Sequence, residues 1–127
     1  MHIYYLLFPD YEALDLMGPV EFLHFLPDVQ LHYISLTGGN ITAHQQFSVA
    51  TVPLSALPAD SLLLLPGGMG TRALVHDAAS GISAGMDMTL GFIADQYGVD
   101  TAVAIANRCE YRWQGNPAQD EFAALYR

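Results

Sequence analysis

The sequence contains no lysine, a single cysteine and few charges of any kind, and these shortages exclude several classes of protein. Four arginines oppose 13 acidic residues, so the net charge is −9. This charge repels phosphate backbones and anionic lipid surfaces, and we expect no direct binding to nucleic acid and no docking on membranes. No apolar stretch approaches the ~20 residues that span a bilayer. The N-terminus lacks the basic region of a signal peptide, and the lone Cys109 cannot form an internal disulfide; both favour a cytoplasmic protein.

Apolar residues, by contrast, are abundant. They make up 52% of the chain, whereas charged residues make up only 13%, about half of the usual ~25%. A length of 127 residues predicts one domain, residues 1–127, with one hydrophobic core. Such a composition is too apolar for a small, self-sufficient monomer. We therefore expect a homodimer or a larger oligomer, or a domain that has lost part of its cover.

Short apolar runs predict strands in the first half of the chain. We expect strands over His2–Phe8, Val29–Leu36 and Ser61–Leu65, with one or two edge strands within Ile41–Leu54. The run Ser61–Leu65 is apolar on both faces, which is typical of a central parallel strand. Such a strand needs a neighbour on each side, and the first strand can supply only one of them.

Helical patterns surround and follow these strands. The Gly18-Pro19 pair predicts a helix start, because proline is favoured at the first helical position. A helix of about two turns should cover Thr71–Asp77. A tight turn over Gly81–Gly85, with Ser83 as the cap, should precede a helix over Met86–Tyr97 that Gly98 ends. A last helix should carry a buried stripe that consists of Ala102, Ile105, Ala106 and Cys109.

The order of these elements predicts the fold class. Strands that alternate with helices indicate an α/β protein with a mainly parallel, doubly wound sheet. Ligands of such sheets bind beyond the carboxyl ends of the strands. Two loops should meet at that edge, namely Phe8–Asp15 and Pro66–Gly70.

At these loops the sequence resembles the ThiJ/PfpI family, which has the class I glutamine amidotransferase-like fold. Three ordered motifs carry the resemblance: FPDYEALDLMGPVEFL, LLLLPGGMGTRALVHD, and SGISAGMDMTLGFIADQYG leading into EYRW. Within the family the likeness is greatest to isonitrile hydratases and to the amino-terminal domains of AraC-type regulators. The resemblance implies a three-layer α/β/α sandwich of flavodoxin-like type and a small-molecule substrate or ligand. It implies no cofactor.

The resemblance also assigns roles to individual positions. Asp15 matches an acidic residue whose carboxyl sits against a nucleophilic thiol. Gly67 and Gly68 match a loop whose backbone N–H groups would stabilise an oxyanion, and Gly85 and Asp87 match the turn and helix start that close the sheet. These three residues, Asp15, Gly67 and Gly68, are the candidate catalytic residues.

The chain departs from the family at one place. Members carry a long central segment with a strand and a sharp turn bearing the cysteine nucleophile, but here only Ala78, Ala79 and Ser80 separate Asp77 from Gly81. The fold should therefore be incomplete, with an apparent internal deletion between Asp77 and Gly81. Either the gene carries an in-frame deletion, or residues are missing from the sequence as written.

Three functions stay open at this point. Intact relatives would use the thiolate of their central cysteine for isonitrile hydratase-like lyase or hydrolase chemistry. This chain should be inactive, because its one cysteine, Cys109, belongs to a packed helical stripe. The alternatives are a non-catalytic ligand-sensing domain of a transcriptional regulator and a degenerate remnant. The histidines show no metal-binding spacing, so we expect no metal site.

Overall fold

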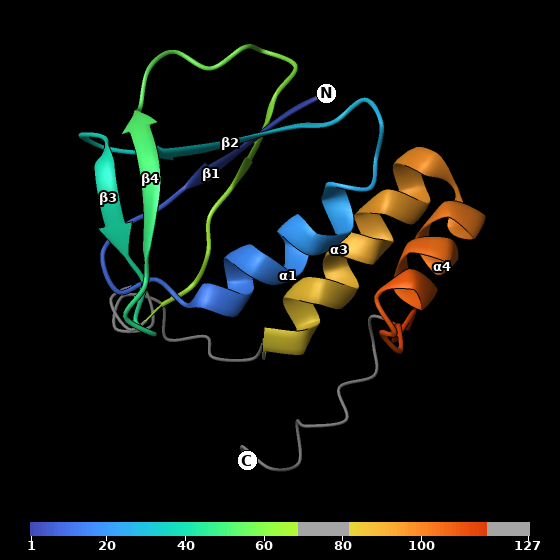
Figure 1. The fold of residues 1–127 in the computed structure, drawn as a ribbon. Helices are drawn as coiled ribbons and strands as arrows, with labels where there is room; N and C mark the ends of the chain where they lie inside the picture. The colour runs from blue at the N-terminus through green and yellow to red at the C-terminus, as the bar shows by residue number, and fades with distance from the viewer. Residues whose placement is uncertain (69–81, 117–127) are drawn as a thin grey trace.

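The computed structural model describes residues 1–68 and 82–116 of the chain (Figure 1). A five-stranded sheet has the order β3-β4-β2-β1-β5. The strands are β1 (His2–Leu6), β2 (Gln30–Ser35), β3 (Gly39–Thr42), β4 (Ser48–Pro53) and β5 (Leu62–Leu64). All strand regions expected from the sequence are present, and the Ile41–Leu54 region holds most of the β3–β4 hairpin.

The sheet is mainly parallel. Strand β1 pairs in parallel with β2 on one side and with β5 on the other, and β2 also pairs in parallel with β4. Only β3 and β4 run antiparallel. Gly38 and Gly39, with φ of 76° and 83°, supply the left-handed backbone for the turn into β3.

Three helices lie together on one side of this sheet (Figure 1): α1 (Ala13–Leu23), α3 (Ile82–Tyr97) and α4 (Val99–Arg108). Helix α1 packs on α3, and α3 packs on α4. The prediction of an α/β fold with a mainly parallel sheet is confirmed. No helix in the described ranges is long and apolar enough to cross a membrane.

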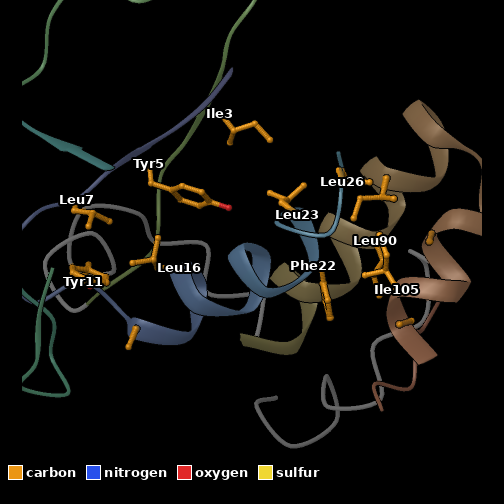
Figure 2. Packing of buried hydrophobic residues seen from close by; sticks show 14 of the residues in the cluster. Ile3, Tyr5, Leu7, Tyr11, Leu16, Phe22, Leu23, Leu26, Leu90 and Ile105 are labelled. Carbon is orange, nitrogen blue, oxygen red and sulfur yellow. The ribbon is translucent and has the colours of Figure 1, made fainter. Parts of the chain in front are cut away.

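The core extends from the sheet across α1 to α3 and α4 (Figure 2). Ile3 and Tyr5 of β1 are buried toward the helices, whereas His2 and Tyr4, on the other face, are only half-buried. This alternation follows from the two-residue period of a strand. The remaining large buried side chains of the cluster are Leu7, Tyr11, Leu16, Phe22, Leu23, Leu26, Leu90 and Ile93.

The Gly18-Pro19 pair lies inside α1, so the prediction that it begins the helix is wrong. The helix begins at Ala13, where the Ala13 N–H donates to Gln45 Oε1 at 3.0 Å. A Cβ on Gly18 would lie 2.7 Å from Met86 Cγ. Glycine therefore permits the close approach of α1 and α3. Pro19, inside the helix, is buried as well, although it cannot make the helical hydrogen bond.

The predicted turn over Gly81–Gly85 is also wrong for the residues that the structure describes. Helix α3 already begins at Ile82 and includes Ser83, so this serine is not the cap. The predicted end at Gly98, with φ of 93°, is confirmed. The buried stripe of α4 is confirmed for Ala102, Ile105 and Ala106.

Strand β5 ends the sheet, with β1 as its one neighbour among the described strands. The neighbour expected from the first strand is thus present. The predicted Thr71–Asp77 helix, the junction between Asp77 and Gly81, and the tail from Pro117 onward lie outside the described residues. The single domain with an internal deletion therefore stays a prediction.

Candidate functional site

The two loops that the sequence placed at one sheet edge meet in the structure. The loop after β1 contains Tyr11, and the loop after β5 contains Gly68; these two residues form an isolated antiparallel bridge. The carboxyl ends of β1 and β5 are adjacent, because the strands pair in parallel. This pairing brings residues that are more than 50 positions apart in the sequence into one small cluster.

Gly67 is bound to the first turn of α1 through both of its backbone polar groups. Its N–H donates to Asp15 Oδ2 at 2.7 Å, and its carbonyl oxygen accepts from the Glu12 N–H at 2.7 Å. Asp15 itself is half-buried, and its N–H donates to the Glu12 carbonyl at 3.1 Å. The acid and the glycine loop are therefore held in a fixed relative position.

Both glycines are required by space. A Cβ on Gly67 would lie 2.7 Å from Asp15 Oδ2. A Cβ on Gly68 would lie 2.7 Å from the Asp10 carbonyl oxygen and 3.0 Å from Tyr11 Cα. Real Cβ atoms do not approach other atoms so closely. A larger residue at Gly68 would therefore push the β5 loop away from the β1–α1 loop, and a larger residue at Gly67 would displace the Asp15 carboxylate.

This arrangement can hold a carboxylate in one orientation. The Asp15 carboxylate lies in the first turn of α1, where the positive end of the helix dipole favours an anion. One of its oxygens is taken by Gly67, whereas Oδ1 has no hydrogen-bond partner within residues 1–68 and 82–116. The Gly67 N–H is already donated to Asp15, so a substrate anion could use this donor only after displacing the carboxylate.

Sequence reasoning missed a second group of residues that supports the site. Glu12 Oε1 accepts from Gln45 Nε2 at 2.8 Å, and the same Gln45 side chain caps the start of α1. The His44 N–H donates to the Tyr11 carbonyl at 3.0 Å, and the Asp10 N–H donates to the Thr42 carbonyl at 3.0 Å. The β3–β4 hairpin thus fixes the β1–α1 loop, and no local sequence signal marks Gln45 for this role.

Cys109 directly follows the last residue of α4 and lies close to the C-terminal part of α1. Its Sγ is 4.0 Å from Glu21 Oε1. Burial and the neighbouring Glu21 carboxylate raise the pKa of the Cys109 thiol, and the Arg108 cation opposes them only in part. A raised pKa keeps the sulfur in the unreactive thiol form, in agreement with its interpretation as a packing residue.

Asp87 has a packing role in the structure. Its Oδ1 accepts hydrogen bonds from the Tyr111 hydroxyl and from the Gln114 N–H, both at 3.0 Å. The pKa of Tyr111 is raised to about 12, mainly by burial and to a smaller extent by the hydrogen bond to Asp87 and the negative charge of Asp87. Asp87 therefore ties the segment after α4 to α3. Gly85 lies within α3.

No group of three potential metal ligands occurs in the part of the chain that the structure describes. His2 Nδ1 and His32 Nε2 lie 2.9 Å apart on the sheet face away from the helices. His24 Nδ1 lies 3.3 Å from the Val20 carbonyl oxygen, and His76 is outside the described residues.

Comparison with known proteins gives one match to a curated sequence. Over 97 residues the chain is 32% identical to the isonitrile hydratase of Pseudomonas putida, a match that includes 76% of this chain and 39% of that enzyme. The chain thus spans about two fifths of the length of this relative. No family model matches the chain.

Solved structures with the same fold are more numerous. A ThiJ/PfpI family protein from Pseudomonas syringae superposes with a TM-score of 0.74 at 17% identity, covering 97% of this chain and 78% of that one. An AraC family transcriptional regulator from P. putida gives 0.69 at 14% identity, covering 84% and 97%. DJ-1beta of Drosophila melanogaster gives 0.70 at 11% identity, covering 88% and 98%. The sequence match to isonitrile hydratase and the fold shared with these structures support the assignment of the chain to the ThiJ/PfpI family.

Proposed function

We propose that this chain carries the acid part of a thiol-dependent, isonitrile hydratase-like site and does not itself turn over substrate. The observation that carries the proposal is the 2.7 Å hydrogen bond between the Gly67 N–H and Asp15 Oδ2, which fixes the carboxylate at the sheet edge. The sequence match to an isonitrile hydratase supports the substrate class.

The chemistry of such a site needs three parts. A thiolate attacks the electrophilic carbon, a carboxyl group manages the proton, and N–H donors stabilise the developing negative charge. Asp15 supplies the second part, and the Gly67-Gly68 loop is our candidate for the third. The only cysteine of the sequence, Cys109, has a raised pKa and directly follows α4. The reacting sulfur would thus have to come from the central segment that intact relatives carry.

The first test is an activity assay with purified protein. Hydration of an isonitrile adds water to the terminal carbon and gives an N-substituted formamide, which chromatography detects. We expect no formamide above the protein-free rate from either the wild-type chain or Cys109→Ser, with the P. putida enzyme as positive control. Turnover by the wild-type chain would overturn the proposal, and its loss in Cys109→Ser would identify Cys109 as the nucleophile.

The second test addresses the acid directly. In Asp15→Ala the Gly67 amide loses its acceptor, and its hydrogen exchange, measured by NMR, should accelerate at least tenfold. Asp15→Asn keeps an acceptor oxygen and should retain most of the protection. Equal protection in wild type and Asp15→Ala would show that the carboxylate does not hold the loop.

A second candidate function is ligand sensing without catalysis in a cytoplasmic transcriptional regulator. The match to the AraC family regulator, which includes 97% of that chain, favours it. The acidic chain would then need a DNA-binding region from a partner or a fused domain. Small isonitriles that raise the melting temperature of the wild-type chain without yielding formamide would support sensing. Absence of any shift across a panel of isonitriles and carbonyl compounds would count against it.

A further inference from the structure

The sheet has one covered face and one open face. Helices α1, α3 and α4 lie together on one side of it (Figure 1), and no helix within residues 1–68 and 82–116 lies on the other side. Parallel sheets normally have helices on both faces, because each strand contributes apolar side chains to both. The composition of the open face therefore indicates whether it meets water or a further layer.

The open face is formed by the side chains that alternate with the buried ones along each strand. The strand pairings place them beside one another across the sheet: Tyr4 and Leu6 of β1, His32 and Ile34 of β2, Val52 of β4, and Leu63 of β5. These six residues include no acid, lysine or arginine. A sheet face that meets water carries polar residues instead, so this face has the composition of an interface.

Apolar side chains of the open face are accessible to a partner. Val52 is 59% exposed, Leu63 is 47% exposed, and Leu65, directly after β5, is 59% exposed. Ile34 of β2, the strand between β1 and β4, is only 2% exposed. The face thus has a closely packed centre and accessible apolar sides. Exposed apolar surface shared by neighbouring strands is typical of a protein–protein interaction site.

The open face is fixed before any partner binds. Strand β1 is hydrogen-bonded to a strand on each side. His2 Nδ1 lies 2.9 Å from His32 Nε2, which ties side chains of β1 and β2 together, and the Tyr4 ring stacks on the His32 ring with centroids 4.4 Å apart. A rigid surface loses little conformational entropy on binding, and this favours affinity.

Charge restricts the kind of partner. Residues 1–68, which contain the five strands of the sheet, have no lysine and no arginine but six acidic residues: Asp10, Glu12, Asp15, Glu21, Asp28 and Asp60. Asp60, two residues before β5, and Asp10, after β1, are exposed at opposite ends of the strands. Cationic side chains at the margins of a partner would therefore meet complementary charge. A second copy, which also has a net charge of −9, would not.

We propose that the open face is a docking site for a partner protein that presents an amphipathic helix with lysines or arginines beside its apolar stripe. The occupant is a helix because helices are the usual cover of a mainly parallel sheet. Its apolar stripe would pack on Val52, Ile34 and Leu63, and its cations would lie near the acids at the strand ends. The proposal does not depend on the proposed function of the site.

The first experiment measures binding of a fluorescently labelled model peptide by anisotropy. The peptide has about 18 residues, or about five helical turns, with leucines on one face and lysines on the other. A peptide with glutamate in place of lysine tests charge, and a scrambled peptide of the same composition tests amphipathicity. We expect the leucine–lysine helix to bind at least tenfold more tightly than either control. No binding, or equal affinity for either control, would overturn the proposal.

The second experiment locates the binding surface. Leu63→Gln and Val52→Gln keep the net charge, and each should weaken binding of the lysine peptide at least fivefold. Met88→Gln changes a 68% exposed residue of α3, on the covered side of the sheet, and should leave the affinity unchanged. Equal effects of all three substitutions would contradict docking on the open face.

NMR and light scattering keep the proposal testable if a variant fails to fold. Added to the wild-type chain, the lysine peptide should shift the amide signals of β1, β2 and β5 most, in a complex of one chain and one peptide. The largest shifts on α3 and α4 would assign the peptide to the helical side and overturn the proposal. So would a dimer of the free chain that Leu63→Gln dissociates, because a second copy would then cover the open face.

Discussion

Alternate residues of β1 lie in two very different environments. Ile3 and Tyr5 are buried beneath the helices, whereas Tyr4, on the other face, is half-buried and stacks on His32 with ring centroids 4.4 Å apart. The helical side has large apolar side chains with almost no exposure, while the open side shows Leu63 to solvent. The difference indicates that the stability of the fold comes mainly from side chains packed between the sheet and the helices. Three pairs of substitutions, each of a closely packed and a less packed position, can measure this.

The largest expected difference is between two leucines of α1. Leu16 is fully buried, so Leu16→Ala should lower the free energy of unfolding by about 2–5 kcal/mol through lost burial and the cavity left behind. Leu14, two residues earlier, is 49% exposed, and Leu14→Ala should change this free energy by less than about 0.5 kcal/mol. Urea unfolding compares the two. Similar losses would show that the exposed side of α1 contributes as much to stability as its buried side.

The next difference is between two helical glycines. Gly18→Ala places a methyl group against Met86 and should cost about 1–3 kcal/mol through overpacking. A Cβ on Gly91 of α3 would meet nothing within 4 Å, so Gly91→Ala should raise stability by up to about 1 kcal/mol through helix propensity. Removing the opposing side chain in Gly18→Ala/Met86→Ala should recover part of the loss. Additive losses in the double variant would contradict the proposed contact.

The smallest difference is between neighbouring tyrosines. The Tyr5 hydroxyl, which points from β1 toward α1 (Figure 2), is buried and has no hydrogen-bond partner within the described ranges. Tyr5→Phe should therefore raise the free energy of unfolding by about 1 kcal/mol, and Tyr4→Phe should change it by less than about 0.5 kcal/mol. A loss of stability in Tyr5→Phe would indicate a bound water or ligand on this hydroxyl.

Tyr5 also predicts a pH dependence of stability. Burial raises the pKa of Tyr5 above its ordinary value near 10 in the folded state. Below pH 10 the Tyr5 hydroxyl is protonated in both states, and its raised pKa does not lower the free energy of unfolding. As the pH rises above 10 this free energy falls, because the unfolded chain releases the proton more readily than the folded chain. Tyr5→Phe should therefore make unfolding less sensitive to pH above 10, which urea unfolding over a pH series would measure.

Much of the fold could be predicted from local patterns, and the errors have physical causes. The strands follow from short apolar runs, and the end of α3 follows from Gly98. The start of α1 was misplaced because a tertiary contact from Gln45, rather than a local cap, determines it. Close packing with Met86 explains Gly18 better than any helix-boundary preference does.

The candidate site could be predicted only in part. The order of strands places the loops of Asp15 and Gly67 at one edge, but the hydrogen bond between them joins residues 52 positions apart. The family resemblance selected these residues, whereas periodicity and composition did not. The resemblance did not reveal that the carboxylate occupies the Gly67 donor, because a motif does not specify the direction of a hydrogen bond.

The double attachment of Gly67 to α1 has a mechanical consequence. Only two residues separate this glycine from the end of β5. Its N–H donates to the Asp15 carboxylate, and its carbonyl oxygen accepts from the Glu12 N–H. Any movement of the end of β5 should therefore change the position of the Asp15 carboxylate as well. The position of β5 and the orientation of the Asp15 carboxylate are therefore mechanically coupled.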